Sequence, residues 1–67
     1  MTRFGVQVVL ENGESAGYVE VEANSPGEAY NIFMKRSTDR TVIFEPFEGQ
    51  TLFIPYNKIL KIAINNM

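Results

Sequence analysis

Residues 4–22 read FGVQVVLENGESAGYVEVE, and this stretch decides the fold. Its first part alternates apolar residues with others, which is the period-2 pattern of a half-buried β-strand. Asn12-Gly13 follows as the strongest two-residue hairpin signal, because both positions tolerate positive φ angles. A two-residue loop at this point predicts that Glu11 faces Glu14. The stretch is therefore expected to form an antiparallel β-hairpin.

The loop also predicts the register of the two strands, because pairs run outward from the turn. This register gathers apolar side chains on one side of the hairpin, and a slip of one residue would destroy that segregation. The predicted pairs are Val6 with Val19, Phe4 with Val21, Arg3 with Glu22, and Gln7 with Tyr18.

A helix is expected after the hairpin. Ser25 is a favourable N-cap, Pro26 suits the first helical position, and Glu28 completes an S-x-x-E capping box. Lys35 and Arg36 are expected in the last turn, where positive charge complements the helix dipole. The apolar stripe expected to pack on the sheet contains Ala29, Ile32 and Phe33.

The last third of the chain predicts three more strands. They are residues 41–45, 51–54 and 59–64, separated by a turn at 46–49 and by a bend at 56–58 that follows Pro55. The element order is β-β-α-β-β-β, and residues 1–67 form a single domain. We expect an α+β fold in which one helix packs on one face of a small antiparallel sheet, with the sheet either open or curled into a small barrel.

Composition points to a domain that needs help to stay folded. A chain of 67 residues buries only about 60% of its surface, and disulfides, a structural metal or oligomerisation usually compensate. The sequence contains neither Cys nor His. Disulfides are therefore excluded, and the usual ligands of zinc, copper and iron are missing. We expect no cofactor and no metal, and we predict a homo-oligomer.

Charge and hydropathy set further limits. The net charge of −2 disfavours a general nucleic-acid binder, which needs a cationic face. No apolar run reaches the roughly 20 residues of a membrane span, so no membrane partner is expected. Without Cys and without an apparent signal sequence, the predicted location is cytoplasmic.

One helix can cover only one face of such a sheet, so the opposite face is predicted to be an interface. Apolar strand residues would otherwise form a contiguous exposed patch, which usually marks a binding surface. The alternative is that the sheet closes into a barrel and buries both sets. The candidate interface residues are Val9, Tyr18, Ile43, Phe47, Phe53, Tyr56 and Ile59.

No catalytic constellation is expected. Nucleophilic catalysis of the Ser-His or Cys-His type lacks its base. Glu20 and Glu22 share a strand face and could in principle form an acid–base pair, but both are predicted to be solvated. The chain is therefore interpreted as a non-enzyme.

The end of the chain, from Gln50 to Ile62, resembles the last two strands of Sm-like small barrels, in which a short turn leads to an I-x-x-I strand. Residues 6–13 together with Gly17 are similar to the opening of that fold. The resemblance implies a ring-forming RNA binder. The sequence departs from that family in its capped helix between the second and third strands and in its lack of an N-terminal helix. The basic and His-bearing RNA-contacting positions of the bacterial members also have no counterpart.

The sequence thus yields two functional hypotheses. The first is a small interaction module that self-associates and binds a protein partner or a small ligand. An accessory or inhibitor protein of a phage or plasmid would fit this size and acidity. The second is an Sm-like small barrel that binds RNA or single-stranded DNA.

Overall fold

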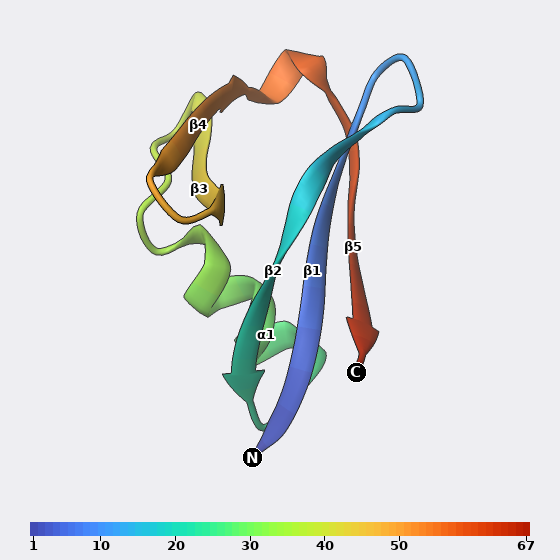
Figure 1. Cartoon of the computed structure of the whole chain (residues 1–67), viewed down its shortest axis with the longest axis vertical. Helices are drawn as coiled ribbons and strands as arrows, with labels where there is room; N and C mark the ends of the chain where they lie inside the picture. Colours follow the sequence, from blue (N-terminus) through green and yellow to red (C-terminus); the bar gives the residue numbers. More distant parts are fainter.

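The structure, a computed structural model, describes residues 1–67 and contains five strands, one α-helix and one short 3-10 helix (Figure 1). The element order is the predicted one. The elements are β1 (Thr2–Leu10), β2 (Ser15–Ala23), α1 (Pro26–Met34), β3 (Thr41–Phe47), β4 (Gln50–Pro55), the 3-10 helix η1 (Tyr56–Lys58) and β5 (Ile59–Asn66).

The α+β fold with antiparallel strands is confirmed, but the prediction of one sheet is wrong. The strands form a three-stranded sheet of order β2-β1-β5 and a separate two-stranded sheet, β3-β4. The barrel alternative is also wrong, because β2 and β3 do not pair. Pro46 of β3 lies beside Gly17 of β2 and has no N–H to donate to a ladder. In Figure 1 the β3–β4 hairpin lies on the side of the molecule away from β5, and α1 passes behind β2 and β1.

The loop of the first hairpin is one residue longer than predicted. The N–H of Gly13 donates to the carbonyl of Leu10 (2.9 Å), and the N–H of Leu10 donates to the carbonyl of Glu14 (2.8 Å). The loop is therefore Glu11–Gly13, so Glu11 does not face Glu14. Gly13 takes a φ of +88°, and the Oδ1 of Asn12 accepts from the N–H of Glu14 at 2.9 Å.

A β-bulge at Ala16 restores the predicted register. Val8 pairs with Gly17 and Val9 pairs with Ser15, which leaves Ala16 as an extra residue on β2. The longer loop shifts the pairing by one residue, and the bulge shifts it back. All the predicted pairs are consequently present: Val6 with Val19, Phe4 with Val21, Arg3 with Glu22, and Gln7 with Tyr18.

The helix begins as predicted and ends earlier. The Oγ of Ser25 accepts a hydrogen bond from the N–H of Glu28 at 3.1 Å, which satisfies one of the free donors of the first turn. The helix ends at Met34 with Lys35 as its C-cap, so Lys35 and Arg36 lie beyond its last turn. Arg36 instead forms an ion pair with Glu45 of β3 at 2.9 Å.

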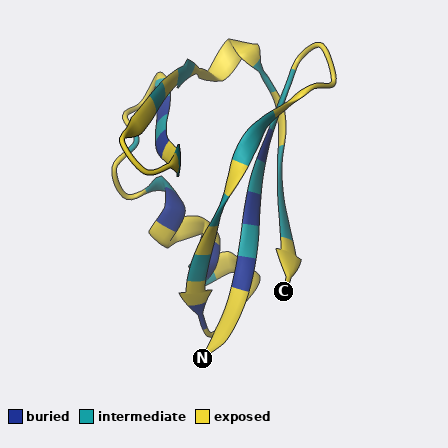
Figure 2. Cartoon of the chain, viewed as in Figure 1, coloured by how far each residue is buried: buried dark blue, intermediate teal, exposed yellow.

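The core is small and lies between the three-stranded sheet, α1 and the β3–β4 hairpin (Figure 2). Only eight of the 67 residues are buried, so most of the apolar side chains are partly exposed. The rings of Phe33 and Phe44 meet with their centroids 5.7 Å apart. Ile32, predicted on the packed stripe, is 44% exposed. The main cluster is Val6, Val8, Phe33, Val42 and Phe44, and a second cluster is Phe4, Ala23 and Ala29.

The last strand returns to the first one. β5 pairs antiparallel with β1, and its inward residues Ile62 and Ile64 face Val8 and Val6. The bend at Tyr56–Lys58 before β5 is confirmed as the 3-10 helix η1. This return leaves β5 at one edge of the three-stranded sheet and β2 at the other.

Candidate functional site

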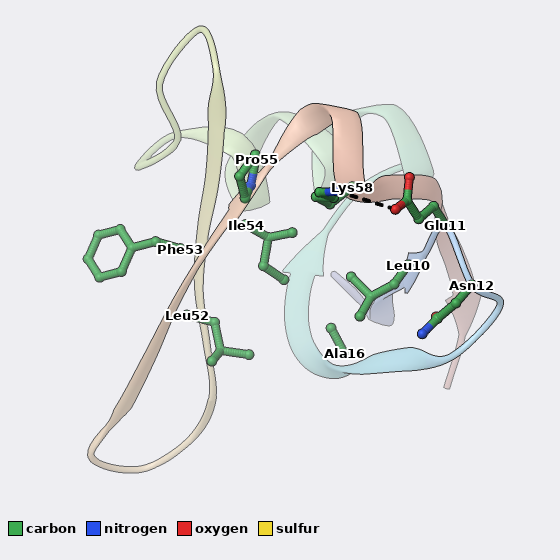
Figure 3. Close-up of a pocket in the computed structure, with 9 residues that line it drawn as sticks. All are labelled: Leu10, Glu11, Asn12, Ala16, Leu52, Phe53, Ile54, Pro55 and Lys58. Carbon is green, nitrogen blue, oxygen red and sulfur yellow. Dashed lines mark hydrogen bonds and ion pairs between the residues drawn. The ribbon is translucent and has the colours of Figure 1, made fainter.

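An apolar cleft of about 540 Å³ opens between the tip of the β1–β2 hairpin and β4 (Figure 3). The side chains of Leu10 and Ala16 enter it from the hairpin, and those of Leu52 and Ile54 enter it from β4. Ala16, Leu52 and Ile54 also pack against the main core cluster, so the floor of the cleft is continuous with the core. Its volume lies within the range of about 300–1,000 Å³ that is usual for ligand sites.

The cleft exists because the chain forms two sheets instead of one. The bulge places Ala16 on the inner side of β2, although strict alternation predicts it on the outer face. Residues 52 and 54 alternate inward on β4, opposite Phe44 and Val42 of β3. Because β4 does not pair with β5 or with the hairpin tip, the space between them stays open.

One rim of the cleft carries charge. The Nζ of Lys58 lies 3.5 Å from an Oε of Glu11, and both side chains are more than half exposed. The backbone of the same two residues is also joined, since the N–H of Glu11 donates to the carbonyl of Lys58 at 2.9 Å. Asn12 and Pro55 complete the rim. The cleft therefore combines an aliphatic floor with a single ion pair at its edge.

A second hollow of about 460 Å³ lies between β2 and the end of β3. It brings together Tyr18 and Phe47, two residues of the predicted interface, with Glu20 and Glu45 beside them. Phe47 is 70% exposed. This hollow is lined by fewer apolar residues than the cleft and has carboxylates on both sides.

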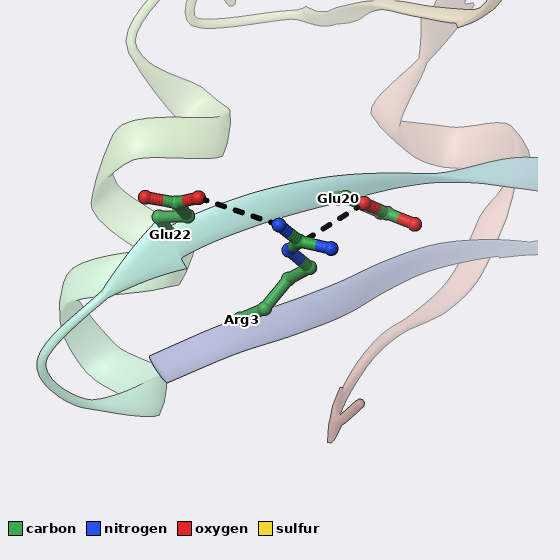
Figure 4. A network of polar contacts seen from close by, with 3 residues as sticks. All are labelled: Arg3, Glu20 and Glu22. Atoms are coloured by element: carbon green, nitrogen blue, oxygen red, sulfur yellow. Dashed lines mark ion pairs between the residues drawn. The ribbon is translucent and has the colours of Figure 1, made fainter. Parts of the chain in front are cut away.

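The outer face of the three-stranded sheet is more polar than predicted. Arg3 lies between Glu20 and Glu22 and contacts their carboxylates at 3.8 and 3.7 Å (Figure 4). Nearby, the amide of Gln7 donates to the hydroxyl of Ser15 at 2.9 Å. The two glutamates are thus solvated and share one cation.

The seven residues of the predicted interface do not form one surface. Val9 and Tyr18 lie on the outer face of the three-stranded sheet, whereas Ile43 and Phe53 are cross-strand partners on the β3–β4 hairpin. Phe53 lies at the cleft, but its ring points away from it (Figure 3).

Two of the seven residues have structural contacts. Tyr56 donates its hydroxyl to the carbonyl of Thr38 at 2.9 Å, which ties η1 to the segment before β3. Ile59 packs against the main core cluster. These contacts give both residues a role within the fold.

The sequence does not group the four residues of the cleft floor, Leu10, Ala16, Leu52 and Ile54, because they come from the first hairpin and from β4, which are far apart in the chain. When two strand residues both point inward, the sequence does not show which one the helix covers and which one lines a cleft. The signal that could have located Ala16 is Gly17, because a glycine inside a strand often marks a bulge.

No group of three or more His, Cys, Asp or Glu side chains is placed to hold a metal ion. None of the helices has the length and apolar character that a membrane span requires.

Comparisons with protein-family models, with curated proteins and with solved structures found no match to this chain. The resemblance to Sm-like barrels gains no support from them.

Proposed function

We propose that the protein is a non-enzymatic binding module that self-associates and receives an apolar side chain of a protein partner in the cleft between the hairpin tip and β4. The observation that carries this proposal is the convergence of Leu10, Ala16, Leu52 and Ile54 on one open space. Burying a large aliphatic side chain there would contribute about 1.5–3 kcal/mol. A cytoplasmic location belongs to the same proposal.

The chemistry of the cleft favours binding over catalysis. Its floor is aliphatic, and the charged groups at its rim, Glu11 and Lys58, are exposed and paired with each other. An acid–base catalyst needs a group whose protonation is tuned by burial or by a like-charged neighbour. The side chains of Glu11 and Lys58 are both more than half exposed to solvent.

The distribution of basic groups favours a protein partner over a nucleic acid. Three of the six basic side chains, Arg3, Arg36 and Lys58, form ion pairs with carboxylates of the same chain. Binding of single strands uses a cationic groove with aromatic rings on which bases stack. The exposed rings of Tyr18 and Phe53 lie on different sheets, so they do not offer such a platform.

Methyl-resolved NMR with N-acetyl-leucine methylamide as the probe tests the cleft. We expect saturable shifts at the methyl groups of Leu10, Ala16, Leu52 and Ile54. Ala16→Leu and Leu10→Phe each fill the cleft and should abolish the shifts. The matched control is Thr51→Leu, which adds the same bulk to an exposed position of β4 and should leave them unchanged. Absence of saturation, or saturation that survives both filling variants, would contradict the proposal.

Light scattering across a concentration series tests self-association. We expect a mass above that of one chain at high micromolar concentration, in both low and high salt. A monomer throughout would contradict this part of the proposal. Saturable, salt-dependent binding of single-stranded RNA would favour the nucleic-acid hypothesis instead.

A further inference from the structure

The direction of the backbone groups shows which edge of each sheet is open. The N–H of Met67 donates to the carbonyl of Arg3 at 3.0 Å, so the odd-numbered residues of β1 and β5 exchange their hydrogen bonds with each other. The N–H of Glu11 agrees, since it donates to Lys58. The backbone groups of Ile62 and Ile64 therefore point away from β1, toward the open side of β5.

The other edges of the sheets are protected. On β3, the N–H of Ile43 donates to the Oγ of Ser37, and the carbonyl of Thr41 accepts from the N–H of Thr38. β4 has six residues and ends at Pro55, which has no N–H. Charge, Pro, short length and covering loops are the usual protections of an edge strand.

The open edge of β2 is protected by charge. Glu20 and Glu22 lie next to each other along its outer face. Pairing of two β2 edges would set carboxylates of the two copies against each other, and like charges directly opposite are destabilising. β5 is eight residues long, contains no Pro and has one charged residue, Lys61. It is the edge that is ready to pair.

One antiparallel register of β5 with a second β5 suits every side chain. When Ala63 faces Ala63 of the other copy, Ile62 faces Ile64, and Lys61 faces Asn65. The Ala63 pair would be of the closely spaced type, with Cα atoms about 4.5 Å apart, which suits a small side chain. In this register the two lysines do not oppose each other. The partly buried Ile62 and Ile64 would extend the core across the two copies.

No strand of the same chain pairs with the outer edge of β5. α1 contacts all three strands from one face of the sheet, and the β3–β4 hairpin lies on the side away from β5 (Figure 1). A twofold axis perpendicular to the sheet at Ala63 would place the two helices on the same face, each over the three strands of its own copy. We propose that two copies of the chain pair antiparallel through the open edges of β5, with Ala63 at the twofold axis, to form one six-stranded sheet. This proposal rests on the proposed self-association and names its surface.

Sedimentation equilibrium of charge variants at Ala63 tests the pairing. Ala63 lies on the outer face of the sheet, opposite Gln7, so a long side chain there extends into solvent in the monomer. Ala63→Lys and Ala63→Glu should each raise the dissociation constant roughly tenfold or more, because each sets two like charges face to face. A mixture of the two variants should form a heterodimer, because lysine then faces glutamate at the axis.

Two further variants provide the control and the register test. Gln7→Lys carries the same charge on the same face but one strand further from the axis. The two new charges would be separated by more than a Debye length of about 8 Å, so the dissociation constant should change by about twofold or less. Asn65→Glu should tighten the dimer, because it places a carboxylate opposite Lys61 of the other copy.

The outcomes separate the two proposals. If the wild-type chain is a dimer that Ala63→Lys leaves intact, or if the Lys and Glu variants do not recover association on mixing, the β5 pairing is wrong and self-association stands. A wild-type monomer overturns both. Circular dichroism confirms that each variant is folded, and Asn65→Glu tests the register even if a variant at position 63 fails to fold.

Discussion

Replacement of Gly17 by alanine is expected to remove a large part of the stability of this domain, for two reasons that can be measured separately. Gly17 follows the bulge in β2 and takes a φ of +127°, a conformation that L-residues rarely adopt. A Cβ at this position would also lie 2.8 Å from the Cβ of Pro46, which is closer than real contacts allow. Gly17 is the place where β2 touches the β3–β4 hairpin.

The two effects have known sizes. Backbone strain in a sparsely populated region costs about 1–3 kcal/mol. Insertion of atoms into a packed site costs a further 1–3 kcal/mol or so. A gain of about 0.4–1 kcal/mol from the stiffer unfolded chain offsets part of this. We expect Gly17→Ala to destabilise the domain by about 2–5 kcal/mol, against a total stability of roughly 3–10 kcal/mol for this length.

Two other glycines provide matched controls. Gly13 has a φ of +88° with no atom within 4 Å of an added Cβ, so Gly13→Ala should show the strain alone, about 1–2 kcal/mol. An added Cβ at Gly5 would meet Met67 at an ordinary 3.6 Å, so Gly5→Ala should be neutral or slightly stabilising. In the Gly17→Ala background, Pro46→Gly should recover part of the loss because it removes the clashing Cβ.

Urea unfolding followed by circular dichroism gives these free energies for the three glycine variants, for Pro46→Gly and for the double variant. The order of destabilisation should be Gly17, then Gly13, then Gly5. A Gly17→Ala variant as stable as Gly13→Ala would refute the contact with Pro46. Additive effects of Gly17→Ala and Pro46→Gly would refute the steric explanation in the same way.

Substitutions at three further positions test the rest of the fold by the same unfolding assay. Phe33→Ala should cost about 3–5 kcal/mol by leaving a cavity beside Phe44, and a loss below 1 kcal/mol or so would show that the helix does not pack there. Ser25→Ala should cost about 1 kcal/mol through the lost N-cap, whereas Ser25→Asp should retain most of the stability. Arg3→Ala should change stability by only about 0.2–1 kcal/mol, with the difference disappearing at high salt, because both of its ion pairs are exposed.

The sequence predicts local structure well where a short motif sets the backbone. The capping box around Ser25 starts the helix at the expected residue, and Pro55 ends β4 as expected. The strand register is also right, although the loop length is not. Residue pairing in the hairpin is the one that places the apolar side chains on the same face. The bulge at Ala16 restores this pairing although the loop is one residue longer than predicted.

The arrangement of the strands was harder to predict. Period-2 patterns show that residues 41–45 and 51–54 are strands, but they do not show which neighbour each strand pairs with. The contact between Gly17 and Pro46 involves residues 29 positions apart and leaves no local pattern. The cleft depends on that long-range arrangement, so its residues could not be grouped from the sequence.

The interface was predicted from the polarity of side chains. That criterion does not detect the open edge of β5, which depends on backbone groups. An edge strand is one whose backbone N–H and C=O groups are unpaired on one side. Every strand carries such groups, so the sequence does not show which of them stay unpaired. In the structure β5 pairs with β1 and with no other strand, and this leaves the N–H groups of Ile62 and Ile64 free. The run of apolar residues from Ile59 to Ile64, interrupted by one lysine, was the available signal.

Amide hydrogen exchange of the wild-type protein at low and high concentration tests the central claim most directly. If two copies pair through β5, the amides of Ile62 and Ile64 become protected as the dimer forms, while those of Tyr18 and Glu20 on the open edge of β2 do not. Protection that stays absent from Ile62 and Ile64 at concentrations where the protein is a dimer would place the interface elsewhere and contradict the account.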